Sequence, residues 1–140
     1  MEGWYLQMLR VKRGDVIYVN LGQNKGSAVT TGTRPCLVLS NNKSSWFSRT
    51  LCVCPITTKM KVNPVHVKVA PCDVVRFLEK ESEILPEQVI TVDKRKVMSK
   101  VGHIPKDSEV MKAINYAVCL QFGLLEYLKE VMEYATEKNR

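Results

Sequence analysis

Long apolar segments are missing from this sequence of 140 residues. No apolar run reaches the roughly 18 residues that a membrane-spanning helix requires. The first residues also lack the charged start and apolar core of a secretory signal. These absences argue against a membrane protein and against a secreted one. We therefore expect a soluble, cytoplasmic protein.

The cysteine pattern of a metal site or a disulfide framework is missing too. The five cysteines are an odd number, and Cys36, Cys52, Cys54 and Cys119 lie in apolar runs, where a thiol behaves as a small hydrophobic side chain. Cys52 and Cys54 are two residues apart on a segment with strand character, which is not the spacing of a zinc knuckle. We expect free thiols, no metal ion and no cofactor.

Repeats, low-complexity segments and linkers are also absent, so we expect a single domain over residues 1–140. A chain of this length can bury roughly two-thirds of its unfolded surface. Residues 1–10 are interpreted as an N-terminal extension, because WYLQML at positions 4–9 is too apolar for a free tail. Residues 125–140 are interpreted as a C-terminal helical extension.

Acidic residues are fewer than basic residues in this chain. The chain has 21 lysines and arginines against 14 aspartates and glutamates, a formal net charge of +7. A basic protein gains affinity for nucleic acid by releasing phosphate counterions. A polyanion is therefore the favoured class of partner, and a well-solvated basic surface is the alternative.

Short runs rich in β-branched and aromatic residues, separated by turn residues, make up most of the first 104 positions. The pattern predicts strands over residues 16–21, 35–40, 51–57, 64–69, 84–92 and 100–104, the fifth with a break at Pro86. Residues 22–33 have the composition of a long loop that serves a site, and residues 41–45 that of a turn. Because no helix separates these strands, a small antiparallel barrel is favoured over a parallel α/β sheet.

The pattern changes after residue 104. Asp107 or Ser108 can cap a helix, and apolar residues from Val110 to Met132 recur near helical spacing. Gly123 interrupts this pattern, so residues 124–140 are interpreted as a second helix or a protruding extension. The expected fold class is mainly β with helices (α+β), a small antiparallel barrel with a C-terminal helix packed on it.

Two polar residues at strand ends are the best candidates for chemistry. Arg34 precedes a proline and a buried strand, and Thr57 ends the next apolar strand, so the two side chains come close if the strands are neighbours. Arginine offers a fixed fork of donors for phosphate, and threonine adds a neutral donor. The alternative is that Arg34 is a solvated charge at a strand edge and Thr57 an ordinary strand residue.

Other residues carry weaker signals. Trp46 and Phe47 can stack on an unpaired base, although aromatic side chains of a small domain more often lie in the core or at its rim. His66 alternates with valines on the polar face of its strand, where a lone histidine is more often a bystander than a catalyst.

Several stretches in a fixed order resemble the MazF/PemK (Kid) family of toxin ribonucleases. They are VKRGDVIYVNL, a loop rich in glycine and serine, GTRPCLVLSNN, LCVCPITTK, ILPEQVITVDKRKVMSKVGHI and a terminal helix, which together span residues 11–125. The resemblance implies an SH3-like barrel, a homodimer and metal-independent cleavage of single-stranded RNA at short sequence motifs. It also implies a protein antitoxin as partner.

The same resemblance assigns residues. Arg34 falls on the catalytic arginine of the family and Thr57 on its catalytic threonine. RNA contacts are implied for Arg13, Ser27, Asn41, Lys59 and Gln88. The chain departs from the family at Ala28, where an acidic residue commonly follows the Gly-Ser pair.

The hypothesis is that the 2′-hydroxyl of the RNA attacks the adjacent phosphate, with Arg34 stabilising the developing charge and Thr57 donating a hydrogen bond. The proton acceptor is unassigned. Two other functions compete: a barrel that binds RNA or a protein without turnover, which Ala28 supports, and a gyrase-directed toxin on the same fold. The presence of both Arg34 and Thr57 favours RNA cleavage.

Overall fold

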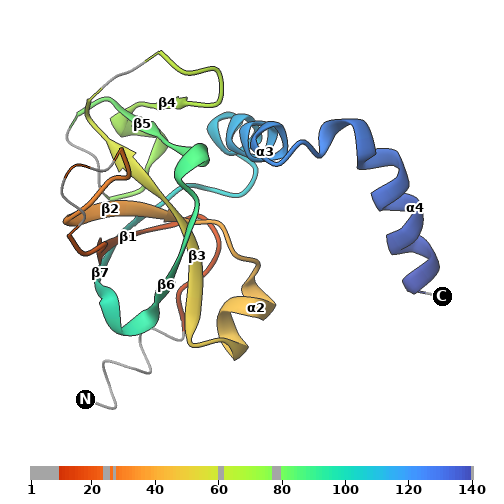
Figure 1. Cartoon of the computed structure of the whole chain (residues 1–140), viewed down its shortest axis with the longest axis horizontal. Helices are drawn as coiled ribbons and strands as arrows, with labels where there is room; N and C mark the ends of the chain where they lie inside the picture. The colour runs from red at the N-terminus through yellow and green to blue at the C-terminus, as the bar shows by residue number, and fades with distance from the viewer. Residues whose placement is uncertain (1–9, 24–25, 27, 60–61, 77–79, 140) are drawn as a thin grey trace.

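A computed structural model of the chain describes residues 10–23, 26, 28–59, 62–76 and 80–139 (Figure 1). Most of the expected N-terminal extension lies outside the described residues, and so does Ser27, an expected RNA contact. Within the described ranges, none of the helices has the length and apolar character needed to cross a bilayer.

Among the described residues, strands that pair in antiparallel fashion form the body of the molecule. They are β1 (Asp15–Asn20), β2 (Thr33–Val38), β3 (Thr50–Thr57), β4 (Val67–Val69), β5 (Ser82–Ile84), β6 (Ile90–Asp93) and β7 (Val97–His103). Their order across the sheet is β4-β5-β3-β2-β1-β7, and β6 pairs with β3 beside that path. The predicted antiparallel β fold is confirmed, while closure of the sheet into a barrel stays a prediction.

The central strands are buried on both faces. Successive residues of a strand point to opposite faces, so Val16 and Ile17 on β1 belong to two different apolar clusters. On β2 the same alternation separates Leu37 from Cys36. The cluster around Val16 also takes in side chains of helix α3 (Glu109–Gln121), which therefore covers one face of the sheet.

Helix α3 begins where the sequence predicts. The Ser108 hydroxyl caps it by accepting a hydrogen bond from the Met111 N–H at 3.2 Å. Its buried face comprises Val110, Met111, Ile114 and Ala117. These side chains recur with helical spacing, and α3 contacts β4 and the 3₁₀ turn η2 (Pro86–Gln88). The helix predicted to pack on the sheet is confirmed.

Residues 41–45 are not a turn, which corrects the sequence-based prediction. Helix α2 (Asn42–Phe47) starts there, with Asn41 as its cap and the Asn41 Oδ1 accepting a hydrogen bond from the Ser44 N–H at 2.8 Å. Asparagine and serine favour helix N-termini and turns for the same reason, because their side chains bond nearby backbone groups. Composition alone does not separate the two.

The strand predicted over residues 84–92 does break at Pro86. β5 ends at Ile84, η2 follows, and β6 begins at Ile90. The three-residue turn η3 (Lys94–Lys96) leads into β7. Two predicted strands differ most in extent: the one over residues 64–69 is only β4, and the one over 100–104 covers the end of the longer β7, which stops at His103.

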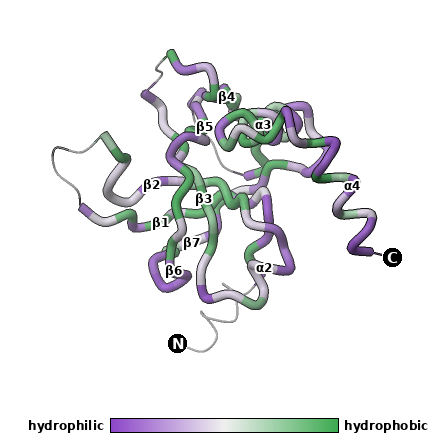
Figure 2. Tube along the Cα trace, turned by 45° about the vertical axis from the view of Figure 1, so that its right-hand side comes forward, coloured by the Kyte–Doolittle hydropathy of each residue, from purple (hydrophilic) through white to green (hydrophobic). Residues whose placement is uncertain are grey.

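The last segment leaves the body of the molecule. η4 (Leu125–Tyr127) and α4 (Leu128–Lys138) project away from the sheet beyond the end of α3 (Figure 1). The turn between α3 and η4 contains Gly123, whose φ of +65° suits glycine. The Leu124 N–H donates a hydrogen bond to the Cys119 carbonyl at 2.9 Å. No residue of α4 is buried. Figure 2 shows that the apolar stretches concentrate in the strands and α3, with α4 standing apart.

Candidate functional site

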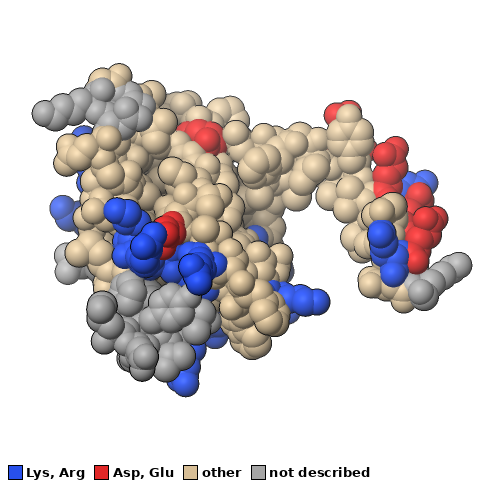
Figure 3. Space-filling model, turned by 60° about the horizontal axis from the view of Figure 1, so that its bottom comes forward, with Lys and Arg blue, Asp and Glu red and all other residues tan. Residues whose placement is uncertain are grey.

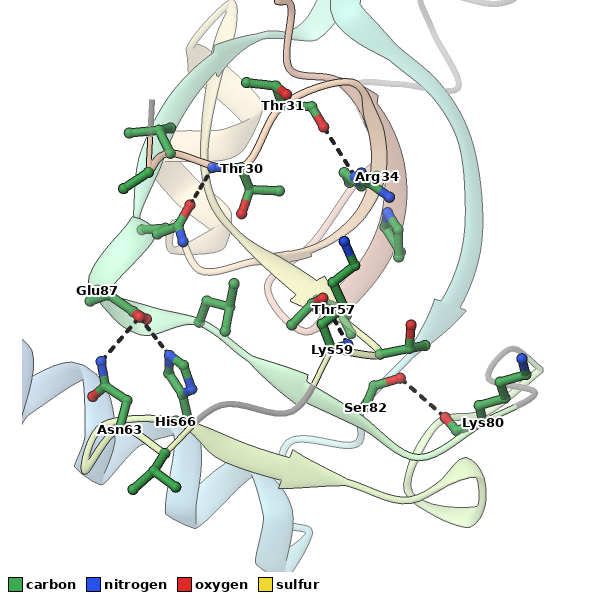
Figure 4. A pocket seen from close by; sticks show the side chains of 18 of the residues that line it. Thr30, Thr31, Arg34, Thr57, Lys59, Asn63, His66, Lys80, Ser82 and Glu87 are labelled. Carbon is green, nitrogen blue, oxygen red and sulfur yellow. Dashed lines mark hydrogen bonds and ion pairs between the residues drawn. The ribbon is translucent and has the colours of Figure 1, made fainter. Parts of the chain in front are cut away.

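A pocket of about 900 Å³ opens at one end of the sheet, where β2 begins and β3 ends (Figure 4). Its other walls come from residues 28–31, from the segment before β4, and from β5 and η2. Its cationic lining residues are Arg34, Lys59 and Lys80. Hydroxyl groups of Thr30, Thr31, Thr57, Thr58 and Ser82 also line it. A cationic pocket rich in hydroxyl groups suits a phosphate-bearing ligand.

Arg34 and Thr57 meet in this pocket because their strands are neighbours. β2 pairs with β3 from Cys36↔Pro55 to Val38↔Val53, Arg34 lies two residues before this paired segment on β2, and Thr57 lies two residues after it on β3. Both residues line the pocket. The sequence-based expectation that the two residues approach each other agrees with this arrangement.

The donors of both side chains are oriented by local contacts. The Arg34 Nε donates a hydrogen bond to the Thr31 carbonyl at 3.0 Å, which fixes the direction of the guanidinium. The Thr57 hydroxyl accepts a hydrogen bond from the Lys59 N–H at 3.1 Å, so its own hydrogen is available for a ligand. An oriented cation beside an oriented hydroxyl donor is suited to binding a phosphoryl group.

Gln88 and Lys59 also line the pocket. The Gln88 Oε1 accepts a hydrogen bond from the Thr30 N–H at 2.7 Å, which ties the loop before β2 to η2. Ala28, the departure from the family pattern, also lines the pocket.

Arg13 and Asn41 do not line the pocket. The Arg13 Nε donates to the Leu39 carbonyl at 3.0 Å, and a terminal nitrogen donates to the Asn115 Oδ1 at 2.8 Å, so this side chain joins the start of β1 to α3. Asn41 caps α2. Both residues therefore have structural partners, and their contacts with RNA stay predictions.

The sequence did not reveal a group formed by His66, Glu83 and Glu87. The His66 Nδ1 lies 2.9 Å from the Glu83 Oε2, and the His66 Nε2 lies 2.5 Å from the Glu87 Oε2. Asn63 donates a hydrogen bond to the same Glu87 oxygen at 3.3 Å. His66 and Glu87 line the pocket, so His66 is no bystander on a polar strand face. The residues around His66 in the sequence did not indicate this group, because its two carboxylate partners lie 17 and 21 residues away.

Within the described residues, no group of three or more His, Cys, Asp or Glu side chains is arranged to hold a metal ion. Burial raises the pKa of the Cys36 thiol to about 12 and that of the Cys54 thiol well above its usual value. These two thiols are core side chains and do not line the pocket.

The fold and the pocket together define a small, mainly antiparallel β protein with a cationic site between adjacent strands. A family model described as PemK-like, MazF-like toxin of type II toxin-antitoxin system matches residues 12–122. The chain belongs to this family. Residues 123–140, which include α4, lie beyond the matched region.

Two curated proteins are similar over most of the chain. Endoribonuclease EndoA of Bacillus subtilis (strain 168) is 35% identical over 120 residues, which cover 84% of this chain and 98% of that protein. Endoribonuclease MazF of Staphylococcus saprophyticus is 32% identical over 117 residues, which cover 81% and 92%.

Solved structures share the fold. An endoribonuclease in complex with its cognate antitoxin, from a mycobacterial species, has a TM-score of 0.67 at 23% identity and covers 81% of this chain and 96% of that one. A MazE-MazF structure (Form-II) from Deinococcus radiodurans has a TM-score of 0.63 at 19% identity, with the same coverage. At these identities the likeness establishes the fold.

Proposed function

We propose that this chain is an endoribonuclease toxin that cleaves single-stranded RNA at short sequence motifs, without a metal ion, and is neutralised by a cognate antitoxin. The observation that carries the proposal is the presence of Arg34 and Thr57 in one pocket, at the ends of adjacent strands. Family membership and the endoribonuclease relatives support it.

In the proposed reaction the RNA supplies its own nucleophile, and these two residues stabilise the reacting phosphate. The 2′-oxygen forms a bond to the adjacent phosphorus while the bond from phosphorus to the 5′-oxygen breaks, which leaves a 2′,3′-cyclic phosphate and a 5′-hydroxyl. The 2′-hydroxyl loses its proton and the departing 5′-oxygen gains one. Negative charge builds up on the phosphoryl oxygens during this step, so preorganised donors lower its barrier.

Arg34 and Thr57 are proposed as those donors. A guanidinium group is a permanent cation, so Arg34 suits the role of a stabiliser of the phosphoryl charge better than that of a proton acceptor. The Thr57 hydroxyl adds a neutral hydrogen bond that fixes the phosphate. The group that accepts the 2′-proton stays unassigned.

Substrate binding is proposed to use Lys59 and Gln88 in the pocket, together with Arg13, Ser27 and Asn41. Lys59 attracts phosphate, and the Gln88 amide nitrogen can donate to a base while its oxygen holds residue 30. Because Arg13 and Asn41 lie outside the pocket, RNA would reach them only with nucleotides beyond the cleaved bond.

The proposed partners are an antitoxin and a second copy of the chain. The solved structures described above include a complex with a cognate antitoxin, which supports an antitoxin here. We propose that a flexible, acidic antitoxin segment covers the cationic pocket and keeps RNA out. We also propose a cytoplasmic homodimer as the working form.

The test is cleavage of a long RNA of mixed sequence in excess EDTA, followed by mapping of the new 5′ ends. Cuts at one recurring motif are expected, and Arg34→Ala is expected to lower the rate by about 10² to 10³. Thr57→Val, which keeps the shape and removes the hydroxyl, should lower it in the same direction. Lys112→Ala removes a cation on α3 that pairs with Glu109 outside the pocket, and serves as the matched control.

Cleavage by Arg34→Ala at the unmutated rate, with RNA still bound, would refute the catalytic assignment. No cleavage by the folded chain would favour the alternative of a barrel that binds RNA or a protein without turnover. Inhibition of DNA supercoiling by gyrase in that case would favour the gyrase-directed alternative.

A further inference from the structure

A second concentration of cations lies at the opposite end of β3 from the pocket. Arg49, Asp93, Lys94 and Arg95 line a cavity of about 390 Å³ there. Arg49 precedes β3 and Thr57 ends it, which separates these two residues by roughly 26 Å along the strand at about 3.3 Å per residue. Figure 3, which brings the lower end of the molecule in Figure 1 forward, shows Lys and Arg side chains gathered on that end of the sheet.

Positive charge dominates this second site. Asp93 is its acidic lining residue, and Arg95 holds that carboxylate in an ion pair with 2.9 Å between the Arg95 terminal nitrogen and the Asp93 Oδ2. Arg49 and Lys96 add exposed cations beside the pair. The Arg95 side chain keeps 79% of its surface exposed despite the ion pair.

Helix α2, which ends two residues before Arg49, carries two large exposed aromatic side chains. Trp46 is 61% exposed and Phe47 84% exposed. α2 is fixed against the cation cluster by Lys94, whose Nζ donates to the Ser45 carbonyl and whose N–H donates to the Arg49 carbonyl at 2.9 Å. Ser45 is buried in this contact while the next two residues turn outward.

We propose that this aromatic–cation patch, comprising Trp46, Phe47, Arg49, Arg95 and Lys96, is a second binding site for single-stranded RNA. This proposal rests on the proposed function, because the RNA segment that the patch binds is the part of the substrate that extends beyond the cleavage pocket. Unpaired bases stack on the two rings, and phosphates lie beside the cations.

The chemistry favours a single strand over other polyanions. Aromatic rings accept any base whose face is exposed, whereas the bases of a duplex are already stacked. Arginine and lysine supply donors only, so they match phosphate oxygens and give salt-dependent affinity. An acidic protein segment would use the cations but would leave the two rings in water.

Fluorescence of Trp46 tests the proposal directly. The chain has two tryptophans, so Trp4→Phe leaves Trp46 as the single reporter. The probe is a 2′-O-methyl RNA of mixed sequence, about 12 nucleotides long, which has no 2′-hydroxyl and is not cleaved. Quenching of Trp46 on titration is expected, because a stacked base contacts the indole face.

Variants measured with the same probe, labelled for anisotropy, assign the binding. Trp46→Leu and Arg49→Gln are each expected to weaken binding at least about fivefold, and Arg49→Gln to reduce the salt dependence. Trp46→Leu keeps an apolar side chain and removes the ring. Lys112→Gln is the matched control, because it removes an exposed cation of α3. Circular dichroism of each variant verifies the fold.

The outcomes separate this inference from the proposed function. Quenching of Trp46 by the probe supports the patch even if the chain cleaves no RNA. Normal RNA cleavage, without quenching and without any effect of the two variants on binding, overturns the second RNA-binding site and leaves the proposed function standing. A change of Trp46 emission with protein concentration in the absence of RNA, together with no quenching by the probe, would show that a second copy covers the patch, and would also overturn the proposal.

Discussion

The His66 Nε2 lies 2.5 Å from the Glu87 Oε2 on the wall of the pocket that also holds Arg34 and Thr57. The other ring nitrogen of His66 faces Glu83, which is only 4% exposed. Both ring nitrogens therefore lie within hydrogen-bond distance of a carboxylate oxygen. The imidazole links η2 to β5 and to the segment before β4.

Replacing His66 is expected to destabilise the fold. His66→Ala removes the hydrogen bonds that the ring makes to Glu83 and Glu87, which should cost about 1 to 3 kcal/mol of unfolding free energy. His66→Gln retains one donor and should cost less. Urea unfolding followed by circular dichroism measures both, and equal stability of His66→Ala and the unmutated chain would contradict a structural role for these hydrogen bonds.

Gln88 gives a prediction that separates a structural role from an RNA contact. Its oxygen holds the Thr30 N–H, so Gln88→Ala should release residues 28–31 and lower kcat/KM for RNA cleavage. Gln88→Glu keeps the acceptor for Thr30 while removing the amide donor and adding a charge that repels phosphate. We expect faster proteolysis of the loop in Gln88→Ala alone, and weaker RNA binding in both variants. Equal proteolysis of the loop in the two variants would show that the hydrogen bond does not order it.

The meeting of Arg34 and Thr57 was predictable because it follows from local pattern. Each residue is adjacent to an apolar strand, and two consecutive strands of an antiparallel sheet are usually neighbours. Both residues then lie at the same end of the strand pair, where they line one pocket. The cap of α3 at Ser108 was predictable for a similar reason, because a capping side chain acts within a few residues of itself.

The role of His66 was not predictable, because its two carboxylate partners come from β5 and η2, farther along the chain. Arg13 shows the same limit: its partner Asn115 is 102 positions away, so the sequence gave no sign of the link that this side chain makes to α3. Tertiary contacts of this length leave no periodic trace in a single sequence.

Thiol reactivity should divide the cysteines by burial. Cys72 is exposed, whereas Cys36 and Cys54 are buried, so a thiol reagent at pH 8 should label Cys72 first in the folded chain. Mass spectrometry of the native protein, with Cys72→Ser as the control, measures the order. Rapid labelling of Cys36 in the folded chain would contradict the buried core of β2.

The raised pKa of Cys36 also predicts how stability changes at high pH. Burial raises that pKa from 9.0 to about 12, so between these values the unfolded chain binds fewer protons at this thiol than the folded chain does. The unfolding free energy should therefore fall as pH rises from 9 toward 12. Cys36→Ala should flatten this part of the profile in urea titrations, and an unchanged slope would show that other groups dominate.

Removal of α4 addresses the segment that extends beyond the family match. α4 is exposed along its whole length, and Leu128, Val131 and Tyr134 expose 41%, 48% and 61% of their surfaces. An amphipathic helix of this length is marginal in water unless its apolar side is packed against something. We therefore expect α4 to serve the proposed homodimer.

A chain ending at Gly123 should keep its sheet and the β-strand contribution to its circular dichroism spectrum, because no buried side chain is lost. Its dimer fraction, measured by light scattering at several concentrations, should fall, and its melting temperature should fall only as far as dimerisation stabilises the fold. Lys129→Ala on α4 keeps the apolar side chains and is the matched control. An unchanged dimer fraction together with an unchanged melting temperature would exclude α4 from the dimer, and its apolar residues would then need a different partner.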